Sequence, residues 1–425
     1  MSDGMRSVLV LGAGIAGMEA SLLLSRAGAK VHLVESKSYI GGTSVLFEEV
    51  FPNLECASCM LAPRQQELLQ DANINLMLHS ELDSVEGGPG RFKVKVRRKA
   101  SFVDPVACIG CGACYEPCPV SVPNEEEMGL SQRKAISIPF PGSLPNIPII
   151  DQERCLHLKG GACQACQDAC VFGAVDFSQK DEIVELDVEA IVVATGSAVQ
   201  DLSGCSKLGY GEFDDVYNSL EFERLRSSNG PSQGEILTSE GLKPSTVALV
   251  HCAGRGEKGY CSSVCCMYLS KFNHYLRSKV PGVEIHEYFT DLCVPGAGQQ
   301  RFFMRMMEGG TDLVRCKDLE VGAADGRLRL SVEGWNGDRT ERVVDMVVLA
   351  PALEPRADAR RVAQILGLSL DQTGFFLSSL SNPVASSRQG VYLIGSARGP
   401  MTMEVAVADA FAAVSGILAA KSVED

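Results

Sequence analysis

A glycine-rich turn directly after the first apolar segment is the feature that most constrains the fold. Residues 8–11 (Val-Leu-Val-Leu) predict a buried strand, and the spacing G-x-G-x-x-G follows before an apolar helix. Gly12 makes the tight turn, Gly14 lets the backbone approach a pyrophosphate, and Gly17 lets helix and strand pack closely. The sequence therefore predicts a dinucleotide-binding βαβ unit at the start of the chain.

Further segments favour FAD as the dinucleotide. A second strand, residues 31–34, ends in Glu35, the acidic side chain expected to bind the ribose hydroxyls. Two short motifs resemble those that complete the FAD site of two-dinucleotide flavoproteins: Gly41, Gly42 and Thr43, and Ala194, Thr195 and Gly196. Near the C-terminus, Gly395, Gly399 and Pro400 precede an alanine-rich helix whose N-terminus is suited to an anionic reduced flavin.

Composition narrows the class of function. The chain has 425 residues and a net charge of −14, which argues against nucleic-acid binding because that function needs a basic footprint. No apolar run reaches the ~18 residues that a membrane-spanning helix needs. We therefore expect a cytoplasmic protein, or one held peripherally at the inner membrane through partner subunits. The seventeen cysteines fall mostly into tight clusters, which indicates metal binding rather than disulfides.

Two cysteine runs in the first half of the chain predict an inserted ferredoxin. The first has the bacterial spacing C-x2-C-x2-C-x3-C-P: Cys108, Cys111, Cys114 and Cys118. The second has a longer first gap: Cys155, Cys163, Cys166 and Cys170. In two-cluster ferredoxins the fourth cysteine of each run ligates the other cluster. We therefore expect Cys170 to complete the first quartet and Cys118 the second, each around a [4Fe-4S] cluster; zinc is the alternative.

A third cysteine group follows the apolar strand at residues 246–250. In a two-dinucleotide flavoprotein the loop after such a strand should carry a second glycine fingerprint and hold a nicotinamide. Here it carries the spacing C-x8-C-x3-C-C: Cys252, Cys261, Cys265 and Cys266. A helix beginning at Cys261 would place Cys261 and Cys265 on one face. Thiolates select iron–sulfur clusters or zinc, so we hypothesise that a metal cluster has replaced the nicotinamide.

The remaining cysteines are less informative. Cys56 and Cys59 form an isolated C-x2-C pair. The pair is half of a cluster or zinc site, a redox dithiol, or simply two reduced thiols, and these alternatives stay open. Cys205, Cys293 and Cys316 are isolated in the sequence and are interpreted as structural thiols.

The order of these segments predicts an α/β fold. The expected fold is that of a thioredoxin-reductase-like flavoprotein, which has two dinucleotide-binding domains, with an inserted α+β bacterial ferredoxin domain. The FAD-binding domain is expected in three parts, residues 1–99, 182–242 (with a linker) and 343–425. The ferredoxin occupies residues 100–181, and residues 243–342 form the second nucleotide-binding-like domain, which carries a [4Fe-4S] cluster.

Several of these motifs together resemble one family. They are the glycine fingerprint, the C-x2-C pair, the inserted ferredoxin, Ser219–Arg224, the block from Cys252 to Lys271, and Gly395–Pro400. The chain resembles the A subunit of heterodisulfide reductase and is similar to the A subunit of the quinone-interacting membrane-bound oxidoreductase. The resemblance implies that Cys252, Cys261, Cys265 and Cys266 bind an unusual [4Fe-4S] cluster beside the flavin. It also implies that Lys271 is a catalytic residue near flavin N5, in a short form with three clusters.

The function implied by this resemblance is an FAD and iron–sulfur electron-transfer component of a larger anaerobic complex. Electrons would pass, by relay or by flavin-based bifurcation, between a donor protein and HdrB/HdrC-like or Qmo-like subunits, and the complex could be dimeric. One rival is a self-sufficient NAD(P)H-dependent flavoprotein similar to the small subunit of glutamate synthase, although its second fingerprint is not matched at Cys252–Gly256. The other rival is a non-enzymatic iron–sulfur scaffold with a structural flavin.

Overall fold

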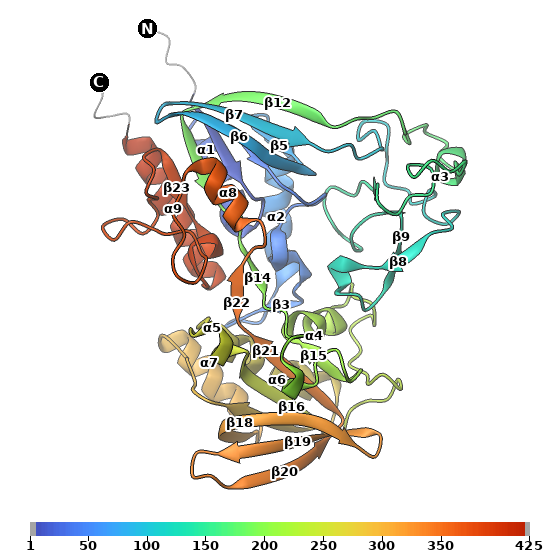
Figure 1. The fold of residues 1–425 in the computed structure, drawn as a ribbon, viewed down its shortest axis with the longest axis vertical. Helices are drawn as coiled ribbons and strands as arrows, with labels where there is room; N and C mark the ends of the chain where they lie inside the picture. Colours follow the sequence, from blue (N-terminus) through green and yellow to red (C-terminus); the bar gives the residue numbers. More distant parts are fainter. Residues whose placement is uncertain (1–5, 421–425) are drawn as a thin grey trace. The chain divides into compact units, whose positions relative to one another are not determined.

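The computed structural model describes residues 6–420 and divides the chain into two compact units (Figure 1). The first unit contains the residues up to Val45, Met60–Gly196, and the residues from Pro355 onward. The second unit contains Leu46–Cys59 and Ser197–Glu354. Each unit is built on its own α/β sheet, so the predicted pair of nucleotide-binding-like folds is confirmed at the level of fold class.

A five-stranded parallel sheet forms the centre of the first unit. Its order is β23-β13-β1-β2-β5: Val391–Leu393, Ala190–Val193, Ser7–Leu11, Lys30–Val34 and Ile74–Met77. The strands are short apolar runs buried on both faces, as expected where helices cover a parallel sheet. Helix α1 (Ile15–Arg26) packs against α9 (Met403–Ala419), so the N-terminal fingerprint and the C-terminal helix meet in one unit.

A three-stranded antiparallel sheet adjoins this core and provides the insertion point. Its order is β12-β7-β6: Glu182–Val188, Arg91–Arg98 and Ser80–Gly88. Alternate residues of β7, Phe92, Val94 and Val96, are buried in a cluster that includes residues of α8 (Ala359–Leu366). Arg98 at the end of β7 lies opposite Glu182 at the start of β12. The chain between these two paired residues can therefore form a separate lobe without disturbing the ladder.

The inserted lobe, residues 99–181, contains little regular structure. Its elements are β8 (Ser121–Pro123), η2 (Glu125–Glu127), β9 (Gln132–Lys134), β10 (Ile136–Ser137), β11 (Ile149–Ile150) and α3 (Ala165–Asp168). Cys118, Cys155 and Cys166 are buried with the apolar side chains of its small core. Such a lobe has few apolar residues to bury, so we expect its stability to depend on the metal that its cysteines bind.

A seven-stranded sheet forms the second unit. Its order is β15-β21-β16-β17-β18-β19-β20: Val216–Asn218, Met346–Pro351, Thr246–Ala253, Glu284–Phe289, Asp312–Ala324, Arg327–Gly334 and Arg339–Val344. The strands from β15 to β18 are parallel, whereas β18, β19 and β20 form an antiparallel ribbon. Its helices include α4 (Ser219–Arg226), α5 (Arg255–Lys258), α6 (Cys265–Lys279) and α7 (Ala297–Met307).

The structure differs from the expected boundaries of the FAD-binding domain at three places. Residues 46–59 and 197–242, expected in that domain, belong to the second unit. The segment from 343 to 354 also belongs there, because β21 pairs with both β15 and β16. Pairing between distant strands places the 343–354 segment and β15 in the second unit, and hydrogen bonds such as that from Lys271 to the Glu49 carbonyl connect residues 46–59 to it. Neither kind of contact leaves a local signal in the sequence.

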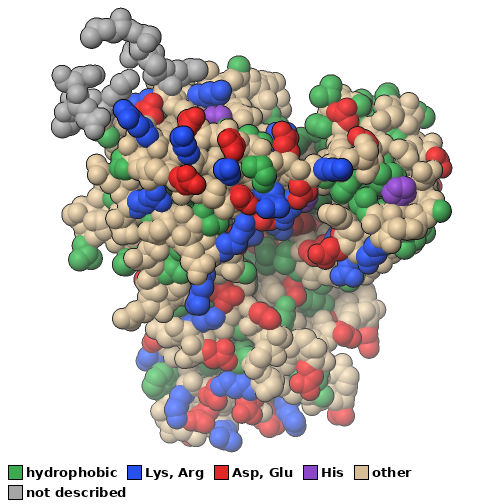
Figure 2. All heavy atoms as spheres, turned by 45° about the horizontal axis from the view of Figure 1, so that its top comes forward, with side chains coloured by type: hydrophobic (Ala, Val, Ile, Leu, Met, Phe, Trp, Pro, Cys, Tyr) green, Lys and Arg blue, Asp and Glu red, His purple; other side chains and the backbone are tan. Residues whose placement is uncertain are grey.

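Charged side chains are mixed over the surface. On the face drawn in Figure 2, basic and acidic side chains are interspersed rather than gathered by sign.

Gly17 provides a test of the fingerprint packing. A Cβ at Gly17 would lie 1.9 Å from the carbonyl oxygen of Gly12, so Gly17→Ala must push helix α1 away from the turn. We expect a loss of ~1–3 kcal/mol in unfolding free energy, measured by anaerobic chemical denaturation. Gly298→Ala in α7 is the control, because its Cβ would meet nothing within 4 Å. Equal stability of the two variants would contradict the packing argument.

Candidate functional site

The N-terminus of α1 forms an open cradle for a phosphate group. Gly14 occupies the N-cap, no side chain caps the helix, and no acidic residue stands in its first turn. Its free N–H groups and helix dipole therefore favour an anion. The predicted glycine turn lies against the cradle, because the Gly41 N–H donates to the Ala13 carbonyl at 2.7 Å. A Cβ on Gly42 would lie 2.9 Å from the Gly14 Cα.

The other predicted dinucleotide residues of the first unit surround the same cradle. Glu35 is buried, and its carboxylate accepts hydrogen bonds from the Ala13 N–H at 2.7 Å and the Lys37 N–H at 2.8 Å. Thr195 lies beside Gly12, and its hydroxyl is buried without a hydrogen-bond partner among the described residues. An orphaned hydroxyl next to an uncapped helix start fits a bound dinucleotide, which would supply the missing polar contacts.

The C-terminal segment also reaches α1. A Cβ on Gly395 would lie 2.9 Å from the Ala16 Cβ, and the Gly395 N–H donates to Asp409 at 3.1 Å. Gly399 (φ +146°) and Pro400 then lead into α9, which begins at Met403. The side chain of Thr402 caps α9 by accepting from the Val405 N–H. At the α9 N-terminus, which is predicted to face a reduced flavin, one of the free backbone N–H groups is therefore already hydrogen-bonded within the chain.

A substitution at Gly14 tests flavin binding separately from folding. A Cβ at Gly14 would approach only the Gly42 Cα, at 4.0 Å, so Gly14→Ala should fold normally. The added methyl group would occupy the space that a pyrophosphate needs, and we expect flavin affinity to fall ~10-fold or more at unchanged thermal stability of the flavin-free protein. Flavin titration with circular dichroism checks both parts; undiminished affinity would place the pyrophosphate elsewhere.

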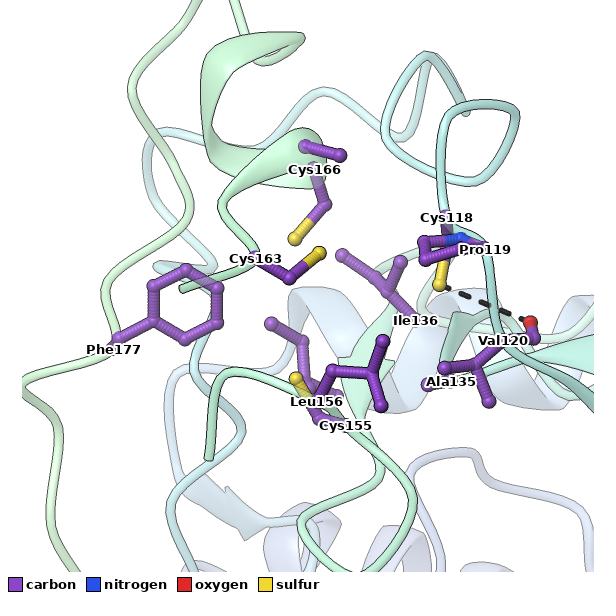
Figure 3. Close-up of a pocket in the computed structure, with 12 residues that line it drawn as sticks. Cys118, Pro119, Val120, Ala135, Ile136, Cys155, Leu156, Cys163, Cys166 and Phe177 are labelled. Atoms are coloured by element: carbon purple, nitrogen blue, oxygen red, sulfur yellow. Dashed lines mark hydrogen bonds between the residues drawn. The ribbon is translucent and has the colours of Figure 1, made fainter. Parts of the chain in front are cut away.

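The inserted lobe gathers its eight cysteines in two separate cavities. Cys118, Cys155, Cys163 and Cys166 line one cavity, and Cys108, Cys111, Cys114 and Cys170 line the other. Figure 3 shows Cys118, Cys155, Cys163 and Cys166 beside apolar side chains that include Ile136, Leu156 and Phe177. The structure thus brings together the two quartets expected from the spacing, with Cys118 and Cys170 exchanged between the runs.

Burial controls the chemistry of these thiols. It raises the pKa of Cys114 to about 12 and that of Cys166 to about 11, and neighbouring cysteine charges add to both increases. These thiols are therefore neutral at pH 7 without metal, and metal binding must release their protons. Apolar walls and four converging sulfurs suit an iron–sulfur cluster, which takes thiolate ligands in a low-dielectric site.

The third cysteine group lies in the second unit at the carboxyl end of β16. The register of β16 against β21 is irregular between Val250 and Ala253, and Cys252 has a positive φ of 59°. The short helix α5 follows, flanked by Gly254 and Gly259, both in the left-handed conformation. The irregular strand end thus leads into a short turn in place of the longer helix of a nucleotide-binding unit.

The four cysteines of this group share one electrostatic neighbourhood. Burial, together with the charges of Cys265, Cys252 and Cys261, raises the pKa of Cys266 to about 12. Burial also raises the pKa of Cys265 to about 11, and its thiol donates to the Pro351 carbonyl at 3.7 Å. Cys266 is buried, Cys252 and Cys265 are half-buried, and Cys261 is exposed. Four neighbouring thiols fit the donor chemistry of a thiolate-ligated cluster.

One expectation about this group is wrong. The helix begins at Cys265 rather than at Cys261, so the two residues do not share a helical face. Cys261 instead lies in the preceding loop, where its sulfur accepts from the Ser263 N–H at 3.3 Å. Cys293, which is isolated in the sequence, lies beside this group in the structure, where its N–H donates to the Cys266 sulfur at 3.3 Å. The sequence spacing of Cys266 and Cys293 does not predict this contact, because the contact depends on how β17 and α6 pack.

Lys271, the predicted catalytic residue, is buried with its charge fully paired. Its Nζ donates to Glu223 Oε2 at 2.6 Å and to the Glu49 carbonyl at 2.9 Å. Aromatic rings of Phe47, Phe272 and Tyr275 lie within 5.1–5.4 Å of Nζ. The pairing and the cation–π contacts fix one cation at a defined point in the second unit. Sequence reasoning missed Glu223, whose only signal was its place in the Ser219–Arg224 motif.

The Lys271–Glu223 pair can be tested by a double-mutant cycle. Lys271→Met alone strands a buried carboxylate and should lower unfolding free energy by ~3–5 kcal/mol, while the combination with Glu223→Gln should cost less. The exposed pair of Lys207 and Asp318 is the control, and Lys207→Met should cost less than ~1 kcal/mol. Additive costs for Lys271→Met and Glu223→Gln in denaturation experiments would show that the two groups do not interact.

The other predicted sulfur and polar groups are placed as follows. Cys56 and Cys59 are both exposed at the start of α2 (Ala57–Gln70), and the Cys59 N–H lies 3.4 Å from the Cys56 sulfur. Cys316 is buried and Cys205 is partly exposed. Within residues 6–420, no three His, Cys, Asp or Glu side chains are close enough to share a single metal ion. No helix in that range is long and apolar enough to cross a bilayer.

Comparison with known proteins agrees with these features. Residues 10–63 match the model of an NAD(P)-binding Rossmann-like domain. The chain is 37% identical over 418 residues to the A subunit of the H(2):CoB-CoM heterodisulfide,ferredoxin reductase of Methanothermobacter marburgensis, covering 96% of this chain and 62% of that protein. It is 34% identical over 469 residues to a protein of Archaeoglobus profundus named for its likeness to the A subunit of heterodisulfide reductase, covering 98% and 66%. The chain thus spans less than two thirds of the length of these relatives.

Solved structures show the same fold at low sequence identity. Thioredoxin reductase of Lactococcus lactis matches 97% of this chain and 97% of its own length, with a TM-score of 0.55 and 13% identity. The predicted thioredoxin-reductase-like fold class is therefore confirmed. At this level of identity the likeness concerns the arrangement of strands and helices alone.

Proposed function

This chain is a homologue of the heterodisulfide reductase A subunits, and on that premise we propose that it is an FAD- and iron–sulfur-containing electron-transfer component of a multi-subunit complex. It is an oxidoreductase whose terminal substrate chemistry lies in partner subunits. The observation that carries the proposal is the gathering of twelve cysteines into three groups of four, one of them at the strand end where a nucleotide fold would otherwise place its phosphate loop.

FAD is the dinucleotide proposed for the first unit. Gly12, Gly14 and Gly17 would hold its pyrophosphate, and Glu35 its ribose. Thr195 would find its missing hydrogen-bond partner there. When bound, a flavin can accept two electrons together and release them singly, the exchange that links a two-electron donor to one-electron clusters.

Three [4Fe-4S] clusters are proposed. Cys108, Cys111, Cys114 and Cys170 would hold the first, and Cys118, Cys155, Cys163 and Cys166 the second. Cys252, Cys261, Cys265 and Cys266 would hold the third. In the inserted lobe, apolar side chains line both groups, which lowers the local dielectric constant around each cluster.

Lys271 is proposed to bias the reduced states of the flavin. Its support is the fixed, buried ammonium group that Glu223 and three aromatic rings hold in place. A cation close to a flavin stabilises the anionic reduced form electrostatically. Glu223 would act as a positioning residue, because it fixes the ammonium group rather than the reacting atoms.

The partners we propose are HdrB/HdrC-like subunits within a multi-subunit complex, with a separate donor protein. A Qmo-like assembly, in which this chain would pass electrons toward quinone, is the alternative. Anaerobic purification from the native host distinguishes the two by the subunits that co-purify. Transient flavin spectroscopy with those subunits then decides between simple relay and bifurcation of the electron pair.

The third cluster is tested by counting iron. We expect about twelve iron atoms per chain in anaerobically prepared protein, and about eight in Cys265→Ala or Cys266→Ala. Cys205→Ala is the control, because Cys205 lies outside the three groups, and its iron content should equal that of the unmodified protein. Unchanged iron in both Cys265→Ala and Cys266→Ala would refute the cluster. Rapid flavin bleaching by NADPH would instead support a nicotinamide-dependent enzyme.

A further inference from the structure

A loop that follows the C-x8-C-x3-C-C motif by more than twenty residues in the sequence contacts these cysteines in the structure. The segment from Thr290 to Gly296 joins β17 to α7. Its Asp291 carbonyl accepts a hydrogen bond from the Cys252 thiol at 3.6 Å. The Asp291 carboxylate pairs with Arg255 at 3.1 Å and with Arg315 at 3.2 Å. These contacts tie the loop to α5 and β18 and hold it beside the sulfurs.

Cys293 extends from this loop toward two of the four cysteines. Its backbone N–H donates to the Cys266 sulfur at 3.3 Å. Burial raises the pKa of Cys293, and the neighbouring Cys261 thiol raises it as well, because the two side chains lie close together. Cys293 is therefore a fifth cysteine beside the four that a [4Fe-4S] cluster would use.

Of the four motif cysteines, Cys261 is the least constrained. Cys252 lies within β16, and Cys265 and Cys266 form the first turn of α6. Cys261 is exposed, in an irregular loop between Gly259 and Ser263, which both have positive φ. Moving Cys261 thus requires no change in a strand or helix, and the side chain next to it is Cys293.

We propose that Cys293 is an alternative ligand at this site and can take the place of Cys261 in binding the cluster. The inference rests on the proposed function, since it presumes the third [4Fe-4S] cluster. In the exchange the bond from iron to Cys261 sulfur breaks and a bond from the same iron to Cys293 sulfur forms. The proton of the Cys293 thiol passes to Cys261, so charge and oxidation state are unchanged.

The exchange is tested with alanine variants of the full chain, prepared anaerobically with flavin. We expect Cys261→Ala and Cys293→Ala each to retain about twelve iron atoms per chain, and the double variant to retain about eight. Cys261→Ala should also change the electron paramagnetic resonance spectrum of the reduced cluster, because a different sulfur then binds the iron. Flavin content and circular dichroism report whether each variant has folded.

Each contrary result has a distinct meaning. Loss of the cluster from Cys261→Ala would show that Cys293 cannot replace it, and loss from Cys293→Ala would make Cys293 obligatory; either overturns the exchange. A double variant with full iron, or a Cys261→Ala spectrum identical to that of the unmodified protein, would also overturn it. Full iron content in both Cys265→Ala and Cys266→Ala would show that this site binds no cluster. That result would contradict the proposed function itself, and it differs from each result that contradicts only the exchange.

Discussion

The chemistry of this protein depends on the burial of thiols from distant segments in shared apolar sites. A buried thiol has a raised pKa and stays protonated unless a metal or a cation stabilises its thiolate, as the pKa values near 11 and 12 of Cys114, Cys166, Cys265 and Cys266 illustrate. A metal cluster removes that cost by bonding to all four sulfurs at once. Folding of the inserted lobe and loading of its clusters are therefore expected to be coupled.

The two units use similar α/β architectures for different purposes. In the first unit the loop after β1 keeps its glycines, and the open start of α1 suits a phosphate. In the second unit the loop after β16 leads into four-residue α5 and a cysteine loop, and α6 begins only at Cys265. The same position at the carboxyl end of a parallel strand can thus hold a dinucleotide or sulfur ligands, since the sheet supplies only the platform.

The buried pair of Lys271 and Glu223 shows how the second unit positions charge. Isolating either group in the interior would cost several kcal/mol, on the order expected for an unpaired buried ion. The pair is retained together with a backbone carbonyl and three aromatic rings, so the ammonium group is held in one place. The pair therefore fixes the position of one charge in the interior of the second unit.

Sequence spacing alone predicted the fingerprint, the eight cysteines of the insertion and the four of the central block, because each of these motifs is local and its spacing reflects fixed chemistry. The tertiary structure decided which segments belong to which unit, placed the start of α6 at Cys265, and brought Cys293 to Cys266 and Cys261. Those outcomes depend on strand pairing and loop packing between residues far apart in the chain. The sequence carries no periodic or spacing signal for such contacts, because they are set by the summed burial of a whole sheet.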